Sequence, residues 1–213
     1  MARKHIAYHW GWGPGIMDKP RKSGPLDHAA LSRRRLLGGA LGIGIGLNLN
    51  PALAKADDPR KLPPQIDDDL MFPSWEHADR PVMLDDVPLE GPPLLAYPRD
   101  PATGTRREKS RLNQILLVRF EPARLDDATR ALGVAGVVAY SGVCTHTGCS
   151  VTVWNTEAGN FLCPCHASEF DPRARASVIG GPAPRPLPML PLRLAEHTLK
   201  VAGPFSARVG AKK

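Results

Sequence analysis

The chain has 213 residues, 42% of them hydrophobic, which is enough for one domain with a packed core and additional segments. Its 23 prolines and 20 glycines argue against long helices and favour short strands joined by rigid turns. Residues 1–54 carry eight Lys and Arg against two Asp, so +6 of the net charge of +7 lies there and +1 remains for residues 55–213. This nearly neutral body excludes the electrostatic footprint of a nucleic-acid-binding protein.

Residues 1–56 have the pattern of an export leader. The segment 32–37 (SRRRLL) resembles a twin-arginine signal, and a glycine-rich apolar run follows at 36–47. A cut after Ala54 or Ala56 fits the small-residue pattern of a cleavage site. The alternative is a retained anchor at 36–54 that associates the protein with a membrane. A spanning helix needs ~20 apolar residues, so we expect cleavage and a periplasmic protein.

Residues 57–112 contain ten prolines and are predicted to be extended. Proline disfavours helix interiors and central strands. We therefore expect neither of these elements here. Two alternatives stay open, a flexible tether and a segment that wraps a partner or the domain itself.

From residue 113 the pattern changes to short apolar segments bounded by turns. A short helix is expected at 125–132, and residues 190–196 and 198–201 should form a closing hairpin. Further strands are expected at 113–120, 136–144, 150–155 and 160–163. The sequence thus predicts an all-β fold, a small antiparallel β domain over 113–205, with residues 206–213 as a C-terminal tail.

Two short boxes hold all four cysteines and two of the seven histidines. Box 1 is residues 144–149 (CTHTGC), and box 2 is residues 163–168 (CPCHAS). Each contains a cysteine and a histidine two or three positions apart, so one loop can turn both side chains toward one site. Thiolates suit iron–sulfur clusters, and imidazole is a common iron ligand. The residues between the boxes leave room for a hairpin that would bring the loops together.

On these boxes, residues 113–205 resemble the Rieske [2Fe–2S] family of the disulfide-containing type, in which two cysteines and two histidines hold the cluster. The resemblance implies a β sandwich with two cluster-binding loops. It further implies that Cys144 and Cys163 bind one iron, that His146 and His166 bind the other, and that Cys149 and Cys165 form a disulfide.

The same resemblance implies four positions that tune the cluster. Ser168 stands where the family has a hydroxyl donor to a bridging sulfur, and Gly148 lets backbone approach the sulfurs. Pro182 belongs to a loop, residues 181–184, that covers the cluster from a third side. Phe170 stands where high-potential members carry a tyrosine, so we expect a lower potential than theirs, because hydrogen bonds to the ligands raise it.

Other uses of the boxes explain less of the pattern. Two plain disulfides would leave His146 and His166 at ligand spacing without a reason. A structural zinc site prefers C-x₂₋₄-C pairs. A Rieske oxygenase needs a second iron held by two histidines and a carboxylate, and outside the boxes residues 57–213 contain only His77 and His197.

The resemblance implies one-electron transfer by a subunit that catalyses nothing alone. Two settings remain open: the iron–sulfur subunit of a bc-type quinol–cytochrome c reductase, and the small subunit of an arsenite-oxidase-like molybdenum enzyme. The expected partners are a large subunit or a cytochrome, and quinol in the first setting.

Overall fold

The computed structural model describes residues 57–76 and 79–212. The predicted leader, its cleavage site and the alternative anchor at 36–54 lie outside the described residues. Within the described ranges, no helix has the length and apolar character needed to cross a membrane.

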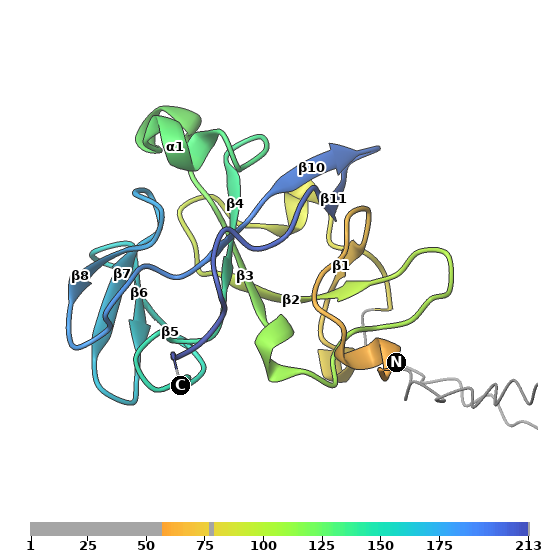
Figure 1. The fold of residues 1–213 in the computed structure, drawn as a ribbon. Coiled ribbons are helices and arrows are strands. Elements are labelled where there is room, and N and C mark those ends of the chain that lie inside the picture. Colours follow the sequence, from red (N-terminus) through yellow and green to blue (C-terminus); the bar gives the residue numbers. More distant parts are fainter. Residues whose placement is uncertain (1–56, 77–78, 213) are drawn as a thin grey trace, which may run out of the picture. The chain divides into compact units, whose positions relative to one another are not determined.

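Two antiparallel sheets make up the described part of the chain (Figure 1). The larger sheet has the strand order β10-β11-β1-β2-β3-β4-β9, and the smaller one is the meander β5-β6-β7-β8. The one α-helix among the described residues is α1 (Asp127–Arg130). The predicted all-β antiparallel fold is confirmed. The strands are β1 (Asp69–Met71), β2 (Leu94–Arg99), β3 (Ile115–Arg119), β4 (Val137–Ser141), β5 (Val153–Asn155), β6 (Asn160–Cys163), β7 (Ser168–Asp171), β8 (Ser177–Gly180), β9 (Met189–Leu190), β10 (Leu192–Ala195) and β11 (Thr198–Val201).

Strand β3 lies between two hydrophobic cores, because successive side chains of a strand point to opposite faces. Leu116 and Val118 pack into the core shared with the smaller sheet, whereas Ile115 and Leu117 pack into a second core on the other face. This double burial explains why the sequence shows an unbroken apolar run instead of an alternating one. The first core also contains the cysteines that begin the two boxes.

The expectation that residues 57–112 contain no central strand is wrong. Strand β2 lies between β1 and β3 and includes Pro98. It pairs with β3 through Leu94–Ala96 and with β1 through Tyr97–Arg99. The Pro98 carbonyl accepts a hydrogen bond from the Arg107 N–H (2.8 Å). Since the N–H and carbonyl of one residue face the same side of an antiparallel strand, the N–H that Pro98 lacks would not have faced β1.

A buried ion pair fixes the segment before β1 to the loop after β2. The Arg107 guanidinium donates to both carboxylate oxygens of Asp68, at 2.7 and 3.1 Å. The Asn113 side-chain amide donates to the carbonyls of Leu62 (2.7 Å) and Arg107 (2.9 Å). Residues N-terminal to position 113 therefore pack into the same folded unit as the strands that follow.

Most of the shorter elements are where the sequence places them. The helix expected at 125–132 is α1, and the expected closing hairpin is β10–β11, whose turn residues Glu196 and His197 have φ of +48° and +69°. Strands β7 and β8 were not predicted, because SEFD contains two acidic residues and SVIG has only two apolar β-branched residues beside a glycine.

Asp69 of β1 makes the unfolding free energy depend on pH in the acidic range. Burial alone would raise the pKa of Asp69, but hydrogen bonds from Arg99 (2.9 Å) and Lys200 outweigh burial and hold that pKa below its usual value. The stabilisation is therefore fully present above the unfolded-chain pKa of about 3.9 and is lost as the pH falls through the lower folded pKa. We expect Asp69→Asn to lose less unfolding free energy than wild type between about pH 5 and about pH 2 in urea titrations. Equal losses in the two proteins would contradict this assignment.

Candidate metal centre

Box 1 forms a tight loop between β4 and β5. The Cys144 N–H donates to the Cys149 carbonyl (2.8 Å), and the Gly148 N–H donates to the Cys144 carbonyl (3.0 Å), so the loop closes on itself. Gly148 has φ of +83°, a left-handed conformation that glycine adopts without strain. A Cβ at Gly148 would have no protein atom within 4 Å. Glycine is therefore favoured here by its positive φ angle and not by a lack of space for a side chain.

Box 2 is the turn of the β6–β7 hairpin. Cys163 ends β6 and is the register partner of Ser168, which begins β7. The four residues between them therefore lie at the hairpin tip. Strands β5 and β6 between the boxes are also an antiparallel hairpin, so the prediction that a hairpin connects the two loops is confirmed.

The two loops meet at their tips. A disulfide joins Cys149 of box 1 to Cys165 of box 2, and the expected disulfide bond is therefore present. The rings of His146 and His166 are 4.7 Å apart between centroids and perpendicular to one another. The Sγ atom of Cys163 lies within 4.8 Å of both disulfide sulfurs. Thiol and imidazole groups from both boxes are thus gathered in one place.

Several buried polar groups of this site have no protein partner in the described part of the chain, and a metal cluster could bind them. Cys144 and Cys163 are the free cysteines of the described residues, and both are buried. Burial raises the pKa of the Cys144 thiol, and Cys163 beside it acts in the same direction. The Nδ1 of His146 and the Oγ of Ser168 are buried without a hydrogen-bond partner among the described residues. Iron would neutralise the thiolates and bind the imidazole nitrogen, so these residues fit a [2Fe–2S] cluster.

The proline-containing segment after β8 contacts both boxes. Gly181 has φ of +76°, and a Cβ there would lie 2.4 Å from the Ala167 carbonyl oxygen, so the chain passes directly against box 2. From box 1, the Thr145 hydroxyl donates to the Arg185 carbonyl (2.6 Å). Pro182 is exposed at the start of this segment. The segment thus forms a third wall beside the two boxes.

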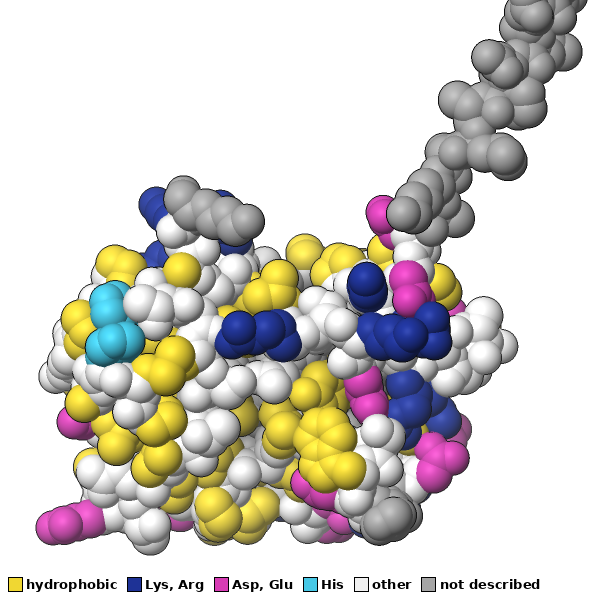
Figure 2. Space-filling model, turned by 90° about the horizontal axis from the view of Figure 1, so that it is seen from below, with side chains coloured by type: hydrophobic (Ala, Val, Ile, Leu, Met, Phe, Trp, Pro, Cys, Tyr) yellow, Lys and Arg dark blue, Asp and Glu magenta, His cyan; other side chains and the backbone are white. Residues whose placement is uncertain are grey.

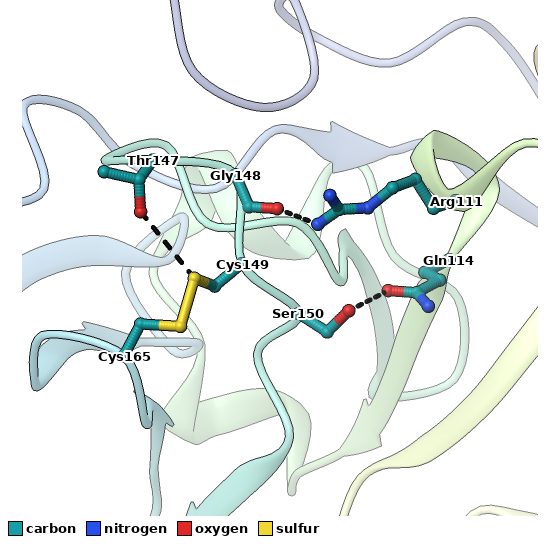
Figure 3. Close-up of a disulfide and its surroundings, with 7 residues drawn as sticks. All are labelled: Arg111, Gln114, Thr147, Gly148, Cys149, Ser150 and Cys165. Atoms are coloured by element: carbon teal, nitrogen blue, oxygen red, sulfur yellow. Dashed lines mark hydrogen bonds between the residues drawn. A yellow bond between two sulfur atoms is a disulfide. The ribbon is translucent and has the colours of Figure 1, made fainter.

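Two residues that sequence reasoning missed also hold box 1. Figure 3 shows Arg111 donating to the Gly148 carbonyl and Ser150 donating to the Gln114 side-chain carbonyl (2.8 Å). Arg111 belongs to the 3₁₀ turn η4 (Arg111–Asn113), and Gln114 follows it directly. No motif marks either residue, because the contacts join positions about 36 residues apart in the chain.

Comparison with known proteins shows what the part of the chain around this site resembles. Residues 103–191 match the family model described as the Rieske [2Fe-2S] domain. A protein of Haloferax mediterranei, named as the Rieske subunit of a respiratory nitrate reductase, is 40% identical over 123 residues, which are 57% of this chain and 52% of that protein. The cytochrome bc1 complex Rieske iron-sulfur subunit of Streptomyces lividans is 38% identical over 98 residues, 45% of this chain and 58% of that protein. The chain spans little more than half the length of either relative.

Solved structures that resemble this chain superpose on it only in part. The cyanobacterial plasma membrane Rieske protein PetC3 from Synechocystis PCC 6803 is 25% identical, with a TM-score of 0.34, over 51% of this chain and 86% of that chain.

Proposed function

We propose that this chain, which carries a Rieske [2Fe–2S] domain, passes single electrons as a subunit of an exported respiratory oxidoreductase. The observation that carries the proposal is that the meeting of boxes 1 and 2 brings together two buried free thiols and two adjacent imidazoles. The sequence offers no nucleophile–base arrangement and no phosphate-binding loop, so the proposed subunit depends on a partner for catalysis.

We assign the cluster ligands residue by residue. Cys144 and Cys163 would hold one iron, and His146 and His166 would hold the other. When bound, the cluster supplies a one-electron redox couple whose potential is raised by the neutral imidazole ligands. Box 1, box 2 and the disulfide hold these four side chains in place, and the surrounding core keeps water from the two cysteines.

The histidine side of the site faces the partner in this proposal. His166 is exposed and His146 half-buried, while Cys144 and Cys163 are buried. Figure 2 shows histidine side chains at the surface with hydrophobic side chains around them. Such a surface suits contact with an apolar part of a redox protein or with a quinol ring. Electrons would enter or leave by the imidazole side.

The setting is proposed from the relatives and from the leader. One relative is named for a bc1 complex and another for a respiratory nitrate reductase, which favours a respiratory partner for this chain. The twin-arginine pattern at 32–37 favours the periplasm, with the 36–54 anchor and the arsenite-oxidase-like setting as alternatives. Cell fractionation separates them: recovery in washed membranes favours a bc-type complex, and soluble recovery with a large subunit favours the molybdenum enzyme.

Metal analysis of the purified, untagged protein tests the proposal directly. We expect two iron atoms and two acid-labile sulfides per chain, with a visible spectrum that bleaches on one-electron reduction. Zinc, or no metal, in freshly prepared protein would refute the assignment of these boxes to an iron–sulfur cluster.

Phe170 offers a test of how a neighbouring residue changes the reduction potential of the cluster. Its ring is fully buried in the core that also contains Cys144 and Cys163. We expect Phe170→Tyr to raise the midpoint potential, because a hydroxyl near a ligating sulfur would stabilise the reduced state. A donor worth ~1.4 kcal/mol corresponds to about 59 mV for one electron. Voltammetry measures the shift. An unchanged or lower potential, with the cluster intact, would contradict this role of position 170.

A further inference from the structure

Two polar contacts hold the residues on either side of Cys149, and both come from a neighbouring segment (Figure 3). On one side, the Arg111 guanidinium donates to the carbonyl of Gly148. On the other side, the Ser150 hydroxyl donates to the side-chain carbonyl of Gln114 (2.8 Å). Cys149 is thus held between two hydrogen bonds as well as by its disulfide.

The segment that supplies these contacts is itself anchored. The main-chain carbonyl of Gln114 accepts a hydrogen bond from the N–H of Gly142 (2.8 Å), two residues before box 1. A Cβ at Gly142 would lie 3.1 Å from the Cβ of Gln114, so the two backbones are in close contact. Strand β3, which begins directly after Gln114, is paired along its length with β4. The contacts on box 1 therefore start from the most extensively paired part of the larger sheet.

Arg111 places a positive charge on this loop. Its side chain is exposed and lines an open groove of about 820 Å³, and no Asp or Glu is among the described residues that line the groove. The charge therefore acts on the Gly148 carbonyl without a carboxylate to offset it. Arg208 lines the same groove, and no hydrogen bond or ion pair joins it to box 1 within 57–76 and 79–212. The chain thus provides a second arginine nearby that lacks the contact.

We propose that Arg111 and Gln114 are positioning residues of the iron–sulfur centre. They hold segment 148–150, so that Cys149 and the adjacent ligand loop keep one arrangement in both oxidation states, and the Arg111 charge favours the reduced state. This inference rests on the proposed function, because it concerns the same cluster. It adds two residues outside both boxes to the structures that set the cluster's potential and the resistance of the disulfide to reduction.

The first test compares Arg111→Met with Arg208→Met in the cluster-loaded full chain. Both variants remove one positive charge from one groove, but only the first removes the hydrogen bond to Gly148. We expect Arg111→Met to shift the ratio of oxidised to reduced cluster at a fixed potential by about threefold or more toward the oxidised form, because a donor and a charge are both lost. Arg208→Met should shift it by less. Equal shifts, or no shift in Arg111→Met, overturn the role of Arg111.

The second test removes the other contact without changing charge. Ser150→Ala loses the hydroxyl that bonds Gln114, and Thr152→Ala is its control on the same connection, at an exposed residue. Labelling of Cys149 and Cys165 by iodoacetamide in limiting dithiothreitol reports how readily the disulfide opens. We expect labelling several-fold faster in Ser150→Ala than in the control. Equal rates overturn the role of Gln114.

Analysis of the wild-type protein separates a failure of the proposed iron–sulfur function from a failure of the positioning roles. A wild-type protein without iron and sulfide refutes the proposed function itself. A wild-type protein with a normal cluster, and variants that match their controls, refutes only the positioning roles. Melting temperatures of all variants, measured alongside, show whether a change in potential or labelling merely follows a loss of overall stability.

Discussion

Replacing Cys163 with serine is expected to remove the iron from an otherwise folded protein. Cys163 is buried at the end of β6, and its thiol is one of two free thiols in the described chain. Serine fills nearly the same volume but does not supply a thiolate, which is the form that binds iron–sulfur clusters. Bound iron should fall from two atoms per chain to below about a tenth of that level, because the remaining ligands cannot hold the cluster. Metal analysis and the visible spectrum give the result.

Cys165→Ser is the matched control for this change. It lies two residues away in the same box, but its sulfur is bonded to Cys149. We expect Cys165→Ser, analysed directly after cluster assembly, to contain more iron than Cys163→Ser. Circular dichroism of both variants should retain the β signal. The ligand assignment is wrong if Cys163→Ser keeps its iron while Cys165→Ser loses it.

Among the variants proposed here, removal of the disulfide is expected to cause the largest loss of unfolding free energy. The bond links positions 16 residues apart, at the tips of two loops that make few strand pairs of their own. A cross-link that closes a loop of this length is worth about 3 kcal/mol through its effect on the unfolded chain. The double variant Cys149→Ser/Cys165→Ser should therefore lose about that much unfolding free energy relative to the oxidised wild type.

Urea unfolding of cluster-free protein measures this difference, since bound metal would add its own stabilisation. Wild type in excess reductant is the control, because it removes the cross-link without changing the sequence. It should unfold at the same urea concentration as the double variant. A difference of less than about 1 kcal/mol between oxidised wild type and the double variant would show that the disulfide is not the main clamp.

The sequence was most informative where chemistry and local pattern coincide. The cysteine and histidine spacing in boxes 1 and 2 singled out side chains that the structure brings together, and the hairpin between the boxes predicted that the two loops meet. The apolar run of β3 predicted a strand because burial on both faces leaves no polar positions in it. In each case the sequence pattern that carries the prediction is local, although the contacts it leads to are not.

The sequence was least informative where the deciding contact is tertiary. Proline counting excluded β2, because the sequence does not show toward which neighbour the missing N–H of Pro98 would point. Arg111 and Gln114 looked like ordinary polar residues, because their partners are brought close only by the folding of the sheet. The ion pair of Asp68 with Arg107 was missed for the same reason, since its members lie 39 positions apart in the chain.

Strand β1 also determines where this domain can be cut. It pairs with β2 on one side and with β11 on the other, so it connects the C-terminal hairpin to the remaining strands of its sheet. A fragment limited to the family match at 103–191 would contain both boxes but would lack β1, β2 and that hairpin. Strand β3 would then present a bare apolar edge, which is a template for aggregation. An expression fragment therefore has to begin near residue 57, well before the first cysteine, if the boxes are to be obtained in soluble form.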